Sequence, residues 1–363
     1  MTAPIGVSLT IMDRDERIIT ISIKALLFGV SALVLLAQPS QAAERINLGV
    51  GGAVKQHFGH VSNDDNGAGE FTSCDVKSDS EIAFGGATTL ENGLQFGCKV
   101  ILKAGSGGAG QINDTYIWNE GDYGQIETGQ ADNAATVIHY AAPNIGLGIH
   151  DSDIGDWITN PGGGDVGSVF QSTFLFLGED KASKVSWLSP RVGGLQLGLS
   201  YTPKFERDGN AQHNGDTGYR DSISVSLNYA QEFGEGTELA TSGGFLTVDS
   251  PGTLSVGSSA EGYSISFNLA VGAFGREGSY GSTIVNPSGG GDTATSFNGS
   301  GFDIGVGYAF DSTTASLSYY QGEVEDDVAT SGDSIHETIM ASIANEIGPG
   351  HGYRKPLSDA LRS

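Results

Sequence analysis

A long acidic segment in the first half of the chain is the clearest candidate for chemistry. Between Ala104 and Asp180 the sequence contains no lysine or arginine, whereas carboxylates recur throughout. The candidate site residues among them are Asp132, Asp151, Asp153, Asp156 and Asp165. Carboxylates gathered around a water-filled passage favour cations, so this segment predicts the negative rim of a constriction. The alternative is a solvated external loop whose charge only aids solubility.

Lys55, Lys99 and Lys103 are the candidate counterpart on the opposite wall. Apolar residues alternate along 46–54 and along 94–102, so parity places these lysines on the other, polar face of their strands. A field between an acidic loop and a basic wall would orient dipolar solutes passing between them. Pairing of the lysines with nearby carboxylates is the alternative.

The elements that would position these residues are β-strands. In residues 222–229 every odd position is apolar and every even position is polar, and residues 195–201, 263–271 and 302–310 show the same alternation. A period of two over this length predicts a strand with one apolar and one polar face. Helical periodicity is absent after the N-terminal segment, so we predict an all-β chain.

Short and long connections alternate along the chain. Tight turns are expected near residues 91–93, 120–122, 189–194, 234–236, 273–275 and 311–313. Longer polar, glycine-rich stretches are expected at about 58–73, 104–111, 130–182, 203–220, 249–261, 281–300 and 324–334. Transmembrane β-barrels have short periplasmic turns and long external loops, so the alternation predicts a transmembrane antiparallel β-barrel. A soluble exported β-protein, such as a lectin or adhesin, would instead have a polar outer face.

Composition excludes several other classes of protein. The chain has 363 residues, a formal net charge of -25 and only 2 cysteines. The acidic balance disfavours nucleic acid as a partner, and the cysteine count excludes a disulfide scaffold or a cysteine-based zinc cluster. The GxGxxG match at 105–110 precedes a predicted strand instead of the helix that a dinucleotide site requires. No strand carries an outward serine with a histidine and a polar orienting group, so we expect no enzyme activity and no cofactor or metal.

Residues 1–42 are expected to be a secretory signal. Arg14, Arg17 and Lys24 precede an apolar run from Ala25 to Ala37, and small residues follow up to Ala42. A cationic start, an apolar centre and a small-residue cleavage site are typical of such signals. The run is shorter than the ~17–25 residues of a spanning helix, which disfavours a membrane anchor.

About fourteen strands are expected between Arg45 and Gly350, although sixteen fit the alternation better. The turn at 348–350 should lead into a further hairpin, but residues 351–363 contain Pro356 and show no alternation. We therefore expect a sixteen-stranded type of barrel at residues 43–350 with its last hairpin missing, followed by an atypical tail at 351–363. A truncated, assembly-impaired form is an open alternative.

Several stretches resemble the general diffusion porins of Gram-negative bacteria, in particular the alphaproteobacterial type. They are RINLGVGGAVKQHFG at 45–59, DVKSDSEIAFGGATTLENGLQFG at 75–97, YGQIETGQADNAA at 123–135, LQLGLSYTPKF at 195–205 and GFDIGVGYAF at 301–310. The resemblance implies a water-filled channel for passive diffusion of small hydrophilic solutes and ions. It also implies a homotrimer, an inward-folded third loop, and an outer-membrane location among lipid and lipopolysaccharide. Such proteins normally end in an aromatic residue, whereas this chain ends in Ser363.

Overall fold

The computed structural model describes the chain in segments. These are residues 11–12, 18–19, 46, 48–60, 74–104, 111–143, 172–174, 181–205, 219–234, 236–249, 259–286, 299–310, 313–325 and 333–345. Two short strands, β1 (Ile11–Met12) and β2 (Ile18–Ile19), pair with each other inside the expected signal. Within the described residues, no helix has the length and apolarity to cross a membrane.

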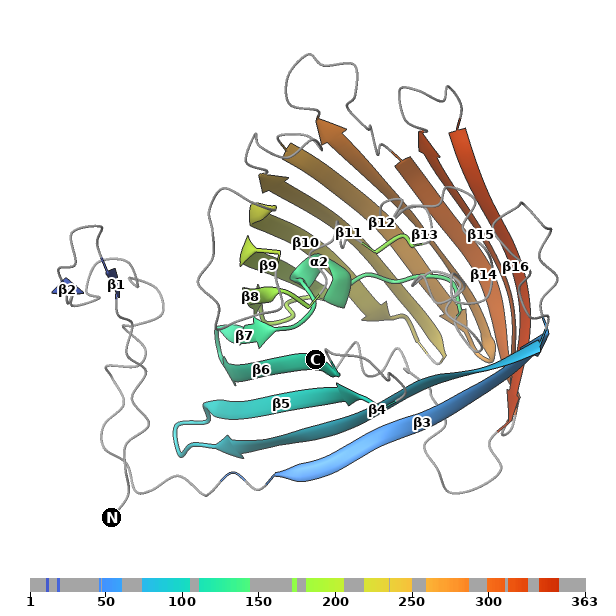
Figure 1. The fold of residues 1–363 in the computed structure, drawn as a ribbon. Coiled ribbons are helices and arrows are strands. Elements are labelled where there is room, and N and C mark those ends of the chain that lie inside the picture. Colours follow the sequence, from blue (N-terminus) through green and yellow to red (C-terminus); the bar gives the residue numbers. More distant parts are fainter. Residues whose placement is uncertain are drawn as a thin grey trace.

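Fourteen further strands form one antiparallel sheet in which each strand pairs with its neighbours in sequence. They are β3 (Gly49–His60), β4 (Cys74–Thr89), β5 (Gln95–Lys103), β6 (Ile112–Gly121), β7 (Gly124–Gln130), β8 (Ser183–Leu188), β9 (Leu195–Lys204), β10 (Arg220–Glu232), β11 (Thr237–Asp249), β12 (Ser259–Val271), β13 (Phe274–Asn286), β14 (Gly299–Phe310), β15 (Thr313–Glu325) and β16 (Asp333–Asn345). The sheet is strongly curved, and β3 and β16 are its two edges (Figure 1). The prediction of an all-β barrel wall with about fourteen visible strands is confirmed.

The predicted alternation of connections is also confirmed. Only two residues separate β6 from β7, β12 from β13, and β14 from β15, whereas residues 131–182 separate β7 from β8. The short helix α2 (Ala134–Val137) lies in that long connection. Asn133 begins this helix by accepting a hydrogen bond from the backbone N–H of Thr136 at 2.9 Å, which satisfies one of the donors that helix starts leave free.

The two faces of the sheet differ in the way that a membrane protein requires. On β10, Ser222, Ser224, Ser226 and Asn228 are almost fully buried, whereas Ile223 and Leu227 are about half exposed. The same arrangement recurs on β9, β12 and β14, whose inward positions are mainly polar or small and whose outward positions carry large apolar side chains. A soluble β-protein would expose the polar face, so this wall is built to contact lipid and to enclose water.

Aromatic side chains form two rows on the outer face. Near the short turns, the rings of Phe274 and Tyr308 have centroids 4.5 Å apart, and Phe310 lies beside Tyr308. Closer to the long connections, the rings of Phe302 and Tyr319 are 5.7 Å apart. From Phe302 to Phe310 the strand rises ~27 Å, which is about 20 Å across the bilayer at the ~35–45° tilt of barrel strands. These rows correspond to the aromatic girdles that border the apolar band of outer-membrane barrels.

Candidate functional site

The connection between β7 and β8, residues 131–182, is called the lumen loop below. Its first part rests on the inner face of β9, because the backbone N–H of Ala134, the first residue of α2, donates a 2.7 Å hydrogen bond to Ser200 Oγ. α2 and the segment after it lie inside the curve of the sheet (Figure 1). The start of the loop is therefore anchored to β9, which is the neighbour of β8, the strand that follows the loop.

From α2 the loop crosses the inner face of the sheet to its far side. The Tyr140 N–H donates to Ser266 Oγ on β12 at 3.1 Å, and the Ala142 N–H donates to Asp303 Oδ1 on β14 at 2.8 Å. Ser318 on β15 then donates its hydroxyl to the carbonyl of Pro143 at 3.1 Å. Inward side chains of β9, β12, β14 and β15 thus hold one continuous stretch of loop across the lumen.

A second piece of the loop, residues 172–174, returns to the same wall. Thr173 donates its hydroxyl to Asp303 Oδ2 at 3.2 Å, and its Oγ1 lies 2.6 Å from Ser279 Oγ on β13. His139 Nε2 lies 3.1 Å from the same Thr173 oxygen, and the His139 ring packs edge-on against Phe174 at 4.8 Å. The Asp303 carboxylate therefore accepts hydrogen bonds from both described pieces of the lumen loop.

Three glycines on the inner wall let the loop backbone approach closely. A Cβ at Gly198 would lie 2.9 Å from Ala134 Cβ, one at Gly281 would lie 2.8 Å from the Thr173 carbonyl oxygen, and one at Gly305 would lie 2.6 Å from Pro143 Cδ. Each distance is shorter than a side chain tolerates. The loop is therefore seated at positions of the wall that have no side chain.

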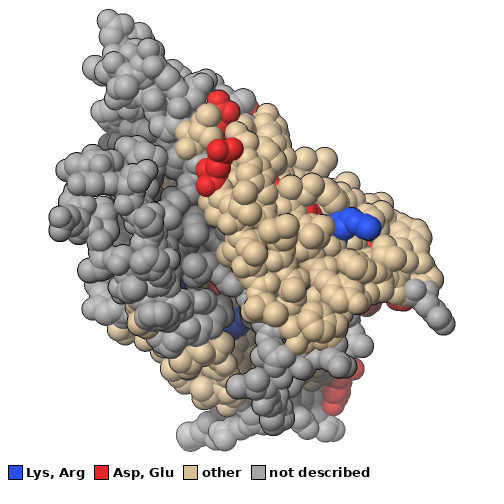
Figure 2. All heavy atoms as spheres, turned by 90° about the vertical axis from the view of Figure 1, so that its right-hand side faces the viewer, with Lys and Arg blue, Asp and Glu red and all other residues tan. Residues whose placement is uncertain are grey.

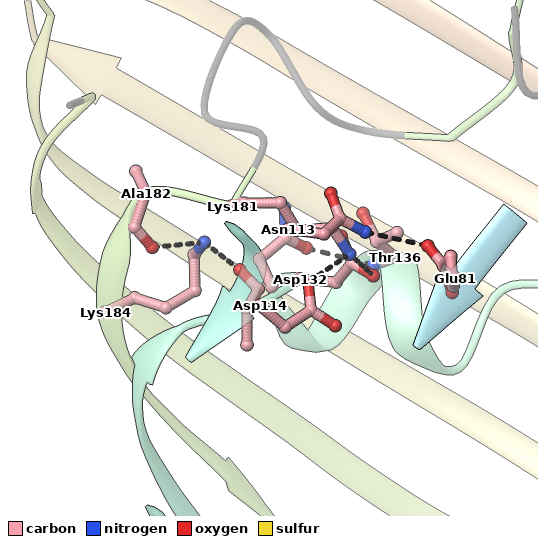
Figure 3. Close-up of polar contacts among 10 residues, drawn as sticks. Glu81, Asn113, Asp114, Asp132, Thr136, Lys181, Ala182 and Lys184 are labelled. Atoms are coloured by element: carbon pink, nitrogen blue, oxygen red, sulfur yellow. Dashed lines mark hydrogen bonds and ion pairs between the residues drawn. The ribbon is translucent and has the colours of Figure 1, made fainter. Parts of the chain in front are cut away.

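A charged cluster joins the two ends of the lumen loop to β6 (Figure 3). Lys181 Nζ lies 2.6 Å from Asp132 Oδ2 and 3.2 Å from Asp114 Oδ1, and the Lys181 and Asp114 side chains are only 13% and 11% exposed. Burial lowers the pKa of Lys181, but the two carboxylates outweigh burial and raise it above its ordinary value. Asp132 and Lys181 hold the start and the end of the loop together.

Further polar contacts surround this cluster. The Lys184 ammonium donates to the carbonyl of Ala131 and, at 2.7 Å, to that of Ala182 (Figure 3). The amide of Asn113 donates to Glu81 Oε1 at 3.1 Å. The Lys184 contacts fix the base of the loop to β8, and the Asn113–Glu81 contact joins β6 to β4.

Of the five residues predicted for the acidic rim, one lies within the described residues and four lie outside them. Asp132 is described and forms an ion pair with Lys181, with its side chain 30% exposed, so it adds less to the field of the lumen than an isolated carboxylate. Asp151, Asp153, Asp156 and Asp165 lie outside the described residues.

The three predicted wall lysines occupy inward register positions. Lys99 lies opposite Gly85 on β4 and Tyr116 on β6, on the face shared with the buried Asp114. In the same strand pairs, Lys103 lies opposite Glu81 and Lys55 lies opposite Asp79.

Asp303, Lys181 and Lys184 were not predicted as site residues. Asp303 stands between Phe302 and Ile304, so alternation alone gives it an inward position. Lys181 directly follows the stretch without basic residues, but pairing with Asp114 requires the antiparallel register that joins β6 to β7 and β7 to β8. Among the described side chains, no group of three or more His, Cys, Asp or Glu could hold a metal ion.

Family comparison supports a membrane channel. The sequence profile of the family described as Gram-negative porin matches residues 29–342, a range that ends inside β16 and covers the thirteen strands before it. The chain belongs to the Gram-negative porin family. This porin therefore resides in the bacterial outer membrane, where the family forms non-enzymatic channels for diffusion.

Solved porin structures share the fold. OmpT of Vibrio cholerae, in a trimer form, has 11% identity and a TM-score of 0.56, with 84% of this porin and 86% of OmpT covered. An anion-selective porin from Comamonas acidovorans has 15% identity, a TM-score of 0.54 and the same coverages of 84% and 86%. Salmonella typhi OmpF in complex with daunomycin has 15% identity and a TM-score of 0.55, again with coverages of 84% and 86%. No curated protein sequence matches the porin.

Proposed function

We propose that this porin is a cation-preferring, water-filled channel for small hydrophilic solutes and ions, narrowed by the lumen loop. The observation that carries the proposal is the path of the loop, whose backbone is bonded to inward side chains from Ser200 on β9 to Ser318 on β15. Because the loop is fixed across the lumen from β9 to β15, solutes can pass only through the space beside the loop.

The preference for cations rests on charge, because the fold leaves the sign of selectivity open. A porin with the same fold, from Comamonas acidovorans, is anion-selective. In this chain the stretch from Ala104 to Asp180 contains only acidic charges, and the first basic residue after it, Lys181, is neutralised by Asp132 and Asp114. We assign Asp151, Asp153, Asp156 and Asp165 to the negative rim, with Asp132 at its base.

The basic wall is the second part of the proposal. Lys99 is its strongest member, because its register partners Gly85 and Tyr116 carry no charge. Lys55 and Lys103 lie opposite carboxylate residues, so we expect a smaller contribution from them.

The finer details of assembly also belong to the proposal. We infer a homotrimer of the alphaproteobacterial type, surrounded by phospholipid and lipopolysaccharide. We also infer an export signal at residues 1–42, a barrel at 43–350 and a separate tail at 351–363. N-terminal sequencing of the exported protein tests the first of these boundaries.

Planar-bilayer recording of the refolded full chain tests the channel proposal, with reversal potentials measured under a salt gradient. We expect conductance steps in multiples of three and a reversal potential that indicates cation preference. The triple variant D151N/D153N/D156N should reduce that preference. The matched control E261Q/E323Q/E337Q removes the same charge from outward positions and should leave the reversal potential unchanged. Anion preference in the unmodified porin, or equal effects of both variants, would contradict the acidic constriction.

A further inference from the structure

Arg276 occupies an unusual position on β13. Its register partners are Leu269 on β12 and Val306 on β14, both on the outward, apolar face of the sheet. In the described strands, the lysines Lys55, Lys77, Lys99, Lys103, Lys184 and Lys204 have inward register positions, and Arg220 lies at the long-loop end of β10. Arg276 is therefore the one basic residue that the described strands place within the lipid-facing surface.

The distance of Arg276 from the β12–β13 turn indicates its depth in the membrane. This connection consists of Gly272 and Ala273, and short connections of outer-membrane barrels face the periplasm. Arg276 lies two residues from Phe274, the first residue of β13, which is ~7 Å along the strand. The Phe274–Tyr308 ring pair lies between Arg276 and this periplasmic end. An arginine here can lay its apolar stem along the rings and bring its guanidinium to the lipid headgroups.

An apolar groove begins beside Arg276 on the same face. It has a volume of about 330 Å³, and its outward lining residues are Ile304, Val306, Leu317, Tyr319 and Ile339. Val306, at its periplasmic end, is directly opposite Arg276. From there the groove follows β14 and β15 toward the middle of the apolar band, and its wall is open to the surroundings, with Leu317 52% and Ile339 74% exposed.

Within the part of the chain that the structure describes, the charge of Arg276 has no protein counterpart. Among the described residues no carboxylate forms an ion pair with it, and the outward acids Glu261, Glu323 and Glu337 lie toward the long-loop end of their strands. Figure 2 shows a largely uncharged tan wall on which one group of blue atoms is exposed. A guanidinium in such apolar surroundings needs an anionic partner, and its planar fork matches a phosphate.

We propose that Arg276 and this groove bind one phospholipid of the periplasmic leaflet. The guanidinium holds the lipid phosphate near the Phe274–Tyr308 pair, and one acyl chain fills the groove between β14 and β15. The proposal requires the outer-membrane location of the porin and is independent of its ion selectivity.

Native mass spectrometry of the refolded full chain in non-ionic detergent, titrated with phosphatidylglycerol, tests this site. We expect one retained lipid whose affinity falls on the order of tenfold in R276Q, as for the loss of a charged hydrogen bond. R276K should keep part of the affinity. L317W fills the groove without changing charge and should also weaken binding. The matched control R220Q removes an exposed charge at the opposite rim, where Arg220 lies 3.7 Å from Asp221, and should bind like the unmodified porin.

Several outcomes would overturn the proposal. Equal lipid retention by R276Q and the unmodified chain would exclude Arg276, and equal weakening by R220Q would indicate a general charge effect. Displacement of the lipid by inorganic phosphate alone would indicate a simple anion site, and preferential binding of lipopolysaccharide would place the site in the other leaflet. Conductance recorded on the same samples shows that each variant is folded and separates this test from that of the channel.

Discussion

Pro143 of the lumen loop lies directly over Gly305 of β14, so that a Cβ at position 305 would be 2.6 Å from Pro143 Cδ. On the same strand, Asp303 accepts a hydrogen bond from the neighbouring loop residue, Ala142. The space left by Gly305 and the carboxylate of Asp303, at neighbouring inward positions of β14, therefore together determine where the loop contacts this strand.

Replacing Gly305 by valine should displace the loop from β14. The added side chain overlaps Pro143, and overpacking of this kind typically costs about 1–3 kcal/mol. We expect noisier single-channel currents and faster proteolysis within residues 131–182, measured on the refolded protein. Gly51 on β3 has no atom within 4 Å of its Cβ position, so G51V is the control. Equal behaviour of G305V and G51V would show that the seat at Gly305 is unimportant.

Replacing Lys181 by methionine should destabilise the base of the loop and strengthen cation preference. The change leaves Asp132 and Asp114 close together without their ammonium partner, and breaking a largely buried pair costs about 3 kcal/mol. Urea unfolding gives the free energy, and the reversal potential gives the selectivity. The double variant K181M/D132N should recover part of the stability, and failure to recover any would argue against the pair.

The same ion pair predicts stability at alkaline pH. The pKa of Lys181 is raised above its ordinary value of 10.5, so the folded porin holds this proton more tightly than the unfolded chain. Its contribution is complete below the ordinary pKa and is lost as the pH rises through the raised value. We expect the urea midpoint to fall more steeply above pH ~10.5 in the unmodified porin than in K181M. Parallel curves would indicate that Lys181 contributes nothing to this pH dependence.

Replacing Asp303 by alanine should release both described pieces of the loop from β13 and β14. Asp303 accepts hydrogen bonds from the Ala142 N–H and the Thr173 hydroxyl, and losing a charged acceptor of buried donors costs roughly 2–4 kcal/mol. Hydrogen exchange of residues 139–143 and 172–174 should accelerate. D303N keeps one acceptor oxygen and should give an intermediate rate, whereas unchanged exchange in D303A would place the anchor elsewhere.

The wall of the barrel was predictable because its pattern is local. Alternation such as Ser224–Val225–Ser226 fixes both the strand and its two faces, and it also gives the inward positions of Lys99 and Asp303. The anchoring of the loop was not predictable in the same way. Ser200, Ser266 and Ser318 are ordinary inward serines, and only the three-dimensional path of residues 134–143 shows that they bind the loop backbone. Asp132 was chosen for its charge, yet its pairing with Lys181 depends on the two ends of a long loop meeting.

The alternation of polar and apolar side chains has a consequence for the journey of the chain to its membrane. Because every second residue of a strand such as β10 is polar, none of the described strands forms the ~20-residue apolar segment that the inner membrane would retain as a helix. The lipid-facing surface comes into existence only when neighbouring strands pair in register. The protein therefore crosses the first membrane as a chain of modest hydropathy and becomes a membrane protein by folding in the second.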